Sequence, residues 1–122
     1  MVRHARACAP DECCGLLLGR SGEIVEAVRA RNRADAAASR FLIDPGDHFA
    51  AIRTARARSL DIVGFYHSHP RSAPEPSVRD VAEFDYPGHF YAIVSLRIEP
   101  AEVRLFRFAS RKFQPVSFVT VA

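Results

Sequence analysis

The chain has 122 residues, of which 48% are hydrophobic and 25% are charged. This length and composition are typical of about one domain, residues 1–122, that can bury a core without disulfide bonds. No apolar run reaches about eighteen residues, and the residues after Met1 lack the apolar core of a signal peptide, so we expect a soluble cytoplasmic protein with no membrane segment.

Charge and cysteine usage exclude several classes of protein. The net charge is +3, and Lys112 is the only lysine beside many arginines. The arginines are spread along the chain without interleaved aromatic residues that could stack on bases, so nucleic acid is not an expected partner. Cys8, Cys13 and Cys14 are odd in number and form no C-x-x-C pair. This pattern argues against a disulfide framework, a zinc finger and a redox site, and we expect thiols that contribute to packing.

Taken in chain order, the first elements are predicted to be a helix and a hairpin. The helix ends near Ala9, before a proline. Residues 12–19 form an apolar run bounded by glycine, which indicates a buried strand, and residues 23–29 partly alternate and indicate its hairpin partner. The polar, alanine-rich stretch 32–40 is predicted to be a loop, and residues 41–43 a short strand.

A second helix has a strong start signal. Asp44 suits the N-cap and Pro45 the first helical position. The helix is predicted to continue to about Arg58, with Phe49 among the residues of its apolar stripe. We expect His48, in the first turn, to be a surface histidine because no residue nearby has metal-ligand spacing.

The second half begins with a strand-like run at residues 60–66 that leads directly into His67. Three prolines between residues 70 and 76 predict a loop, and Ser77 is predicted to begin a helix through about Asp85. Three further strands are predicted, at residues 90–96, 102–108 and 113–121.

Residues 67–80 bring together two histidines, a hydroxyl group and a carboxylate. His67 and His69 lie at the end of a strand, so their side chains leave on one face with alpha carbons roughly 6.6 Å apart. The loop can fold Asp80 back as a third ligand. Three protein ligands with water in the fourth position are expected of a catalytic zinc site.

Two simpler explanations compete with a metal site. An H-x-H pair is common by chance. The residues Ser77-x-x-Asp80 also form a plausible capping box, in which both side chains only satisfy free backbone donors at the start of a helix.

Zinc-dependent hydrolysis also needs a base that takes a proton from the metal-activated water and delivers it to the leaving amine. Glu12 is well suited, because it stands at the entry to an apolar strand, where partial burial would raise its pKa. A solvated carboxylate is the alternative reading of Glu12. Glu75 and Glu83 are competing candidates for the role of base.

These residues resemble the signature of the JAMM, or MPN-plus (Mov34/MPN/PAD-1), metalloprotease family. The resemblance rests on Glu12, on His67-Ser68-His69, on Ser77 and on Asp80. Three longer stretches are also similar to family sequence, and with them the resemblance covers almost the whole chain: residues 10–19, 41–45 and 64–70.

The resemblance implies an α+β (α/β-type) domain with a mixed, mostly antiparallel curved sheet flanked by helices, similar to cytidine deaminase. It also implies a zinc peptidase or isopeptidase. By carry-over, His67, His69 and Asp80 would bind Zn²⁺, Glu12 would act as general base and acid, and Ser77 would hydrogen-bond the tetrahedral oxyanion.

Family substrates are peptide or isopeptide bonds after the C-terminus of ubiquitin or of ubiquitin-like sulfur carriers, and the short chain is most similar to small prokaryotic members. The family usually has a strand and a full helix before the glutamate, whereas about nine residues precede Pro10 here. A missing edge strand or helix turn at this end would expose apolar surface, and such a surface could favour a homodimer. Two other functions stay open: a non-catalytic MPN-type binding module, and a zinc amidohydrolase that acts on a small amide.

Overall fold

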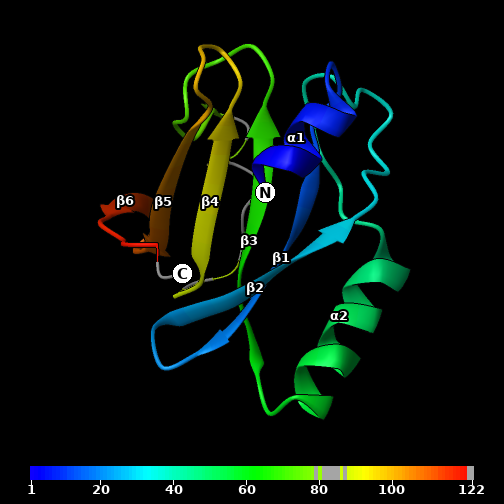
Figure 1. Ribbon diagram of the computed structural model, residues 1–122, viewed down its shortest axis with the longest axis vertical. Helices are drawn as coiled ribbons and strands as arrows, with labels where there is room; N and C mark the ends of the chain where they lie inside the picture. The colour runs from blue at the N-terminus through cyan, green and yellow to red at the C-terminus, as the bar shows by residue number, and fades with distance from the viewer. Residues whose placement is uncertain (79, 81–85, 87, 121–122) are drawn as a thin grey trace.

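The computed structural model describes residues 1–78, 80, 86 and 88–120 (Figure 1). Within these residues the chain forms two helices and six strands. They are α1 (Val2–Cys8), β1 (Cys14–Arg20), β2 (Glu23–Ala30), α2 (Pro45–Ala57), β3 (Asp61–His69), β4 (Phe90–Ser95), β5 (Glu102–Ala109) and β6 (Lys112–Val116). In this part of the chain, no helix combines the length and the apolar character needed to cross a bilayer.

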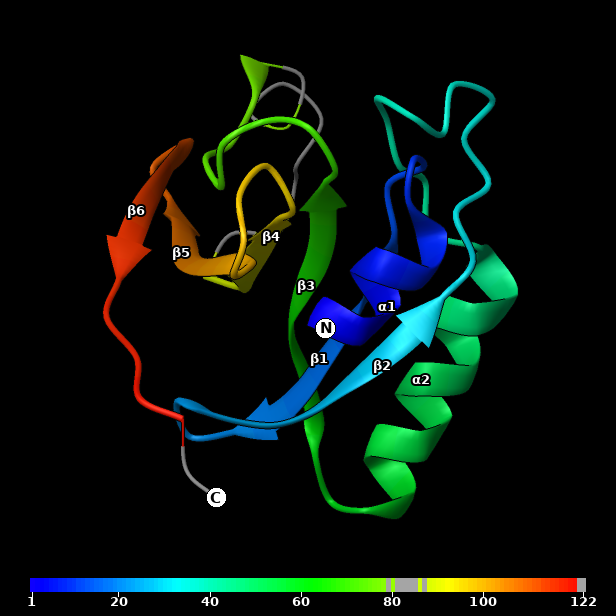
Figure 2. The same ribbon diagram turned by 45° about the horizontal axis from the view of Figure 1, so that its top comes forward.

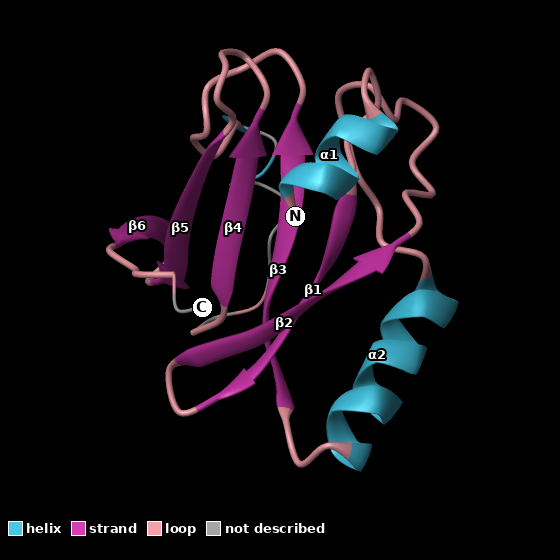
Figure 3. Cartoon of the chain, in the orientation of Figure 1, coloured by secondary structure: helices cyan, strands magenta, loops and turns pink. Residues whose placement is uncertain are grey.

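The described strands form one six-stranded sheet in the order β2-β1-β3-β4-β5-β6. Strands β3 and β4 run parallel, and every other neighbouring pair is antiparallel. The sheet twists and curves between its β2 and β6 edges, as Figures 2 and 3 show. The predicted α+β class with a mixed, mostly antiparallel sheet is therefore confirmed.

Alternation along the strands creates a core on each face of the sheet. In β1, Leu16 and Leu18 pack with Ala51 and Ala55 of α2 on one face. The intervening Leu17 packs on the other face, in a cluster that includes Ala5 of α1. The two helices thus cover opposite faces of the central strands.

Local signals explain the hairpin and the second helix. Ser21 and Gly22 both have positive φ, 50° and 77°, which matches the tight turns that join twisted antiparallel strands. Asp44 caps α2 by accepting a hydrogen bond from the backbone N–H of Asp47, and Pro45 occupies the first turn. The predicted helix start is confirmed.

One predicted strand is wrong, and another is predicted too long. Residues 41–43 form only an isolated antiparallel bridge between Asn32 and Ile43, because the N–H of Leu42 bonds to the Asn32 side chain and not to a neighbouring strand. The last strand ends at Val116, where its ladder with β5 ends, and residues 117–120 are irregular. Of the helix predicted at residues 77–85, all positions after Asp80 lie outside the described residues.

Two predictions about α2 are also wrong. Phe49 is 61% exposed and does not belong to the buried stripe. The buried stripe contains Ala51 and Ala55. Phe49 lies two positions before Ala51, and residues two positions apart in a helix are separated by about 200° around the axis, so Phe49 points to nearly the opposite side. His48 is half-buried with its ring edge-on to Phe65 at 5.8 Å, and burial lowers its pKa, so it is not a surface histidine.

Candidate metal centre

The carboxyl end of β3 carries two histidines that face the same way. His67 and His69 are both buried, and their Nε2 atoms lie 2.9 Å apart. The ring of His67 stacks on Phe41 with centroids 4.5 Å apart and an interplanar angle of 20°, and it also contacts Tyr91. The alternation of a strand therefore places both imidazoles on one face, as the sequence predicts.

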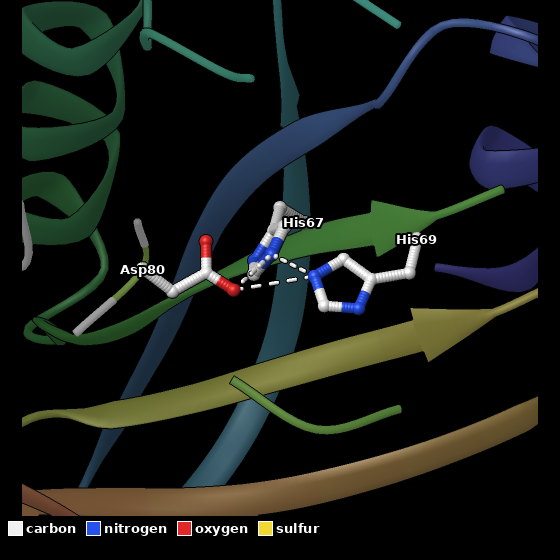
Figure 4. Close-up of side chains that lie close together, drawn as sticks. All are labelled: His67, His69 and Asp80. Carbon is white, nitrogen blue, oxygen red and sulfur yellow. Dashed lines mark hydrogen bonds and ion pairs between the residues drawn. The ribbon is translucent and has the colours of Figure 1, made fainter. Parts of the chain in front are cut away.

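Asp80 joins the two histidines from a helical position that comes after the loop following β3. Its Oδ2 lies 3.3 Å from Nε2 of His67 and 3.2 Å from Nε2 of His69. Figure 4 shows the three side chains pointing toward one another. The structure thus brings together all three residues that the sequence predicts as metal ligands.

Ser77 and Asp80 also form the predicted capping box. The backbone N–H of Ser77 donates to Oδ2 of Asp80 at 2.8 Å, and the N–H of Asp80 donates to Oγ of Ser77 at 3.0 Å. The capping bonds are therefore present, but they are not the only contacts of the pair, because Asp80 also contacts both histidines. The arrangement is compatible with a metal site, because the same bonds aim the Asp80 carboxylate at the histidines.

The three ligand atoms fit a single metal ion. In a tetrahedral zinc site with bonds of about 2.0–2.1 Å, neighbouring ligand atoms lie about 3.3 Å apart. The two contacts of Asp80, at 3.2 and 3.3 Å, match this separation, and the distance between the imidazole nitrogens, 2.9 Å, is shorter. Among the described residues, His67, His69 and Asp80 form a group whose donor atoms lie close enough together to hold one cation.

The remaining ring nitrogens differ in their partners. Nδ1 of His69 lies 2.8 Å from the carbonyl oxygen of Ala73, an arrangement that orients a metal-binding imidazole with Nε2 toward the ion. Nδ1 of His67 is buried without a hydrogen-bond partner among the described residues. The contacts with Phe41 and Tyr91 hold the His67 ring by packing instead.

Electrostatics favour an ionised Asp80. Burial alone would raise the pKa of this carboxyl group, but hydrogen bonds from His67 and His69 outweigh burial and hold its pKa well below the usual range. Complete burial lowers the pKa of His67 against the opposing effect of Asp80. Burial also acts to lower the pKa of His69, but the contacts with Asp80 and Ala73 prevail and raise it. A cation bound at His69 would therefore compete with a proton.

Glu12 lies beside this cluster, just before β1. It is 8% exposed, and its charge contributes to the raised pKa of His69. Its backbone N–H donates to the carbonyl oxygen of Ala37 at 2.7 Å, and its carbonyl oxygen accepts from Nδ2 of Asn32 at 3.0 Å. The solvated reading of Glu12 is wrong, because loop 32–40 covers this position.

The competing glutamates do not share this environment. Glu75 is exposed and pairs with Arg104 at 3.5 Å. Glu83 lies outside the described residues. Burial near His69 thus distinguishes Glu12 from Glu75.

Sequence reasoning missed three residues that support the site. They are Asn32, Phe41 and Ser68, whose Oγ accepts the N–H of Cys13 at 2.8 Å. Their contacts come from segments distant in sequence, so no local spacing indicates them. The only sequence signal is that Phe41 and Ser68 lie inside stretches that resemble family sequence.

The fold and the site together define a class of protein. A His, His and Asp donor set beside a buried glutamate has the ligand number typical of a catalytic metal site, not a structural one. The chain belongs to the family of prokaryotic homologues of the JAB domain, which matches residues 1–109. The predicted membership of the small prokaryotic JAMM/MPN type is thereby confirmed.

Curated relatives include two proteins named for their activity. The chain is 35% identical over 101 residues to the desampylase of Haloferax volcanii, covering 78% of this chain and 73% of that protein. It is 33% identical over 98 residues to the CysO-cysteine peptidase of Mycobacterium tuberculosis, covering 80% of this chain and 67% of that protein.

Solved structures share the fold. A protein from Desulfitobacterium hafniense superposes with a TM-score of 0.87 at 27% identity, covering 98% of this chain and 84% of its own. A JAB1/MPN domain protein from Archaeoglobus fulgidus superposes with a TM-score of 0.60 at 22% identity, covering 95% of this chain and 85% of its own. The second likeness concerns the fold alone.

Proposed function

We propose that this protein is a zinc-dependent metallopeptidase that hydrolyses the peptide or isopeptide bond after the C-terminus of a ubiquitin-like or sulfur-carrier protein. One observation carries the proposal: His67, His69 and Asp80 converge within the distances of a single ion. The chain is a hydrolase of peptide or isopeptide bonds, in line with relatives named desampylase and CysO-cysteine peptidase. These names also support a small carrier protein as the substrate class.

His67, His69 and Asp80 would hold the zinc. When bound, zinc supplies a Lewis acid that polarises a carbonyl oxygen and lowers the pKa of a water molecule. The low pKa of Asp80 keeps its carboxylate charged, and burial lowers the pKa of His67, which favours its neutral form; these are the forms that bind a metal ion.

Glu12 would take the proton from the attacking water and deliver it to the leaving amine. Its position beside His69 supports this role, because a general base must lie within reach of the reacting atoms. Ser77 would donate a hydrogen bond to the oxyanion. The Ser77 oxygen already accepts the N–H of Asp80, which leaves its own proton for donation.

Metal analysis and one substitution test the proposal. Purified protein should contain about one zinc per chain. Glu12→Gln should keep the zinc and lose cleavage of ubiquitin-like or sulfur-carrier fusions that bear a short C-terminal extension. The matched control is Glu75→Gln, which removes an exposed carboxylate and should leave cleavage unchanged.

The outcomes separate this function from its alternatives. A metal-free wild type, or a fully active Glu12→Gln variant, would refute the proposal. Cleavage of small amides with no cleavage of the fusions would identify a small-amide hydrolase. Binding of a carrier protein that survives both His67→Ala and chelation, without turnover, would identify a non-catalytic module.

A further inference from the structure

The side chain of Asn32 makes four hydrogen bonds to backbone groups near the site. Its Nδ2 donates to the carbonyl oxygens of Glu12 at 3.0 Å and Arg40 at 2.9 Å. Its Oδ1 accepts the backbone N–H groups of Ala34 and Leu42, each at 3.0 Å. Both donor hydrogens and both acceptor positions of the carboxamide are therefore used.

The first of these bonds acts on the backbone of Glu12. The peptide group between Glu12 and Cys13 is held at both ends, because Asn32 binds its carbonyl oxygen and Ser68 Oγ binds its N–H at 2.8 Å. The N–H of Glu12 itself donates to Ala37, in the loop that Asn32 closes. Hydrogen bonds on both sides of the Glu12 alpha carbon thus set the direction in which its side chain leaves.

Two other bonds act on Phe41. Arg40 and Leu42 are its neighbours in the chain, and both bind the Asn32 carboxamide. Leu42 is tied a second time, because its carbonyl oxygen accepts the N–H of Arg33 at 2.8 Å. Asn32 therefore holds the backbone on either side of Phe41, whose ring stacks on His67.

We propose that Asn32 is a positioning residue of the catalytic centre, which orients Glu12 through its carbonyl group and seats Phe41 against His67 through the neighbours of Phe41. This inference rests on the proposed function, since it assigns Asn32 the task of orienting the base. A carboxamide suits the position because it supplies donors on one side and an acceptor on the other. A carboxylate of the same shape would place oxygen against two carbonyl oxygens.

The decisive variant is Asn32→Asp, which keeps the shape and the acceptor and removes both donors. Misplacing a catalytic group by about 1 Å costs about 10²-fold in rate, so kcat should fall by about 10²-fold with little change in KM or zinc content. Ser39→Ala, in the same loop, removes only a weak 3.5 Å bond to Ala36 and should leave kcat unchanged.

A double-mutant cycle tests whether Asn32 acts through Glu12. If it does, adding Asn32→Asp to Glu12→Gln should produce little further loss, because the base is already absent. An equal loss of residual activity in both backgrounds would overturn the assignment of Asn32 to the orientation of Glu12. So would a wild-type kcat in Asn32→Asp.

Hydrogen exchange supplies a readout that needs no substrate. Asn32→Asp should speed exchange of the Glu12 amide roughly tenfold by loosening the loop, while the Ala55 amide in α2 stays unchanged. If Asn32→Asp does not fold, the smaller and uncharged Asn32→Ser serves in the same measurements. A wild type that cleaves no fusion refutes the proposed function alone, and unchanged exchange at Glu12 refutes the role of Asn32.

Discussion

Replacing Ser68 with alanine tests how firmly β3 holds the entry to β1. The Ser68 hydroxyl is fully buried and accepts the N–H of Cys13, which is 1% exposed. Water cannot replace the lost acceptor at such a position, and an unsatisfied buried amide costs about 1–3 kcal/mol. For a chain of this size, about 2 kcal/mol corresponds to a fall in Tm of roughly 6–10 °C.

The assay is thermal unfolding of Ser68→Ala beside wild type, with urea unfolding to obtain the free energy directly. Ser39→Ala makes the same chemical change at an exposed serine and should shift the free energy of unfolding by less than about 0.5 kcal/mol. A loss in Ser68→Ala no larger than in this control would show that the Cys13 amide finds another partner and does not depend on the Ser68 hydroxyl.

Three further predictions concern stability. His4 is buried against the Tyr66 hydroxyl, and burial lowers the pKa of its imidazole. The unfolded chain therefore binds more protons than the folded chain when the pH drops below about 6.5, so Tm should fall with pH in this range. The fall should be less steep in His4→Gln, which has no titrating group at this position. Leu17→Ala empties a site with 0% exposure and should cost about 2–5 kcal/mol in urea unfolding, whereas Val25→Ala, at an exposed site, should cost less than about 0.5 kcal/mol. Chelation of zinc should lower Tm reversibly, because binding to the folded state alone stabilises it, and a Tm indifferent to chelator and to added zinc would contradict the metal site.

Local patterns predicted most elements of the fold. The Ser21-Gly22 turn and the Asp44-Pro45 helix start are short-range signals, and the structure confirms both. The errors arise where a neighbour decides the outcome. Residues 41–43 have the sequence pattern of a strand, but the Asn32 side chain accepts the hydrogen bond from the N–H of Leu42. That N–H is then not available for pairing with a neighbouring strand. The predicted strand after Phe113 ends at Val116 because its ladder with β5 stops there.

The sequence by itself indicated which residues are the candidate metal ligands. The two-residue period of a strand puts His67 and His69 on one face, and the capping pattern aims Asp80 at them. Only the tertiary structure decided which glutamate lies beside them and what holds it there. Glu12, Asn32 and Ser68 come from three separate segments, and they meet because β1 lies between β2 and β3 in the sheet. Strand order depends on long-range packing, which no spacing along the chain records.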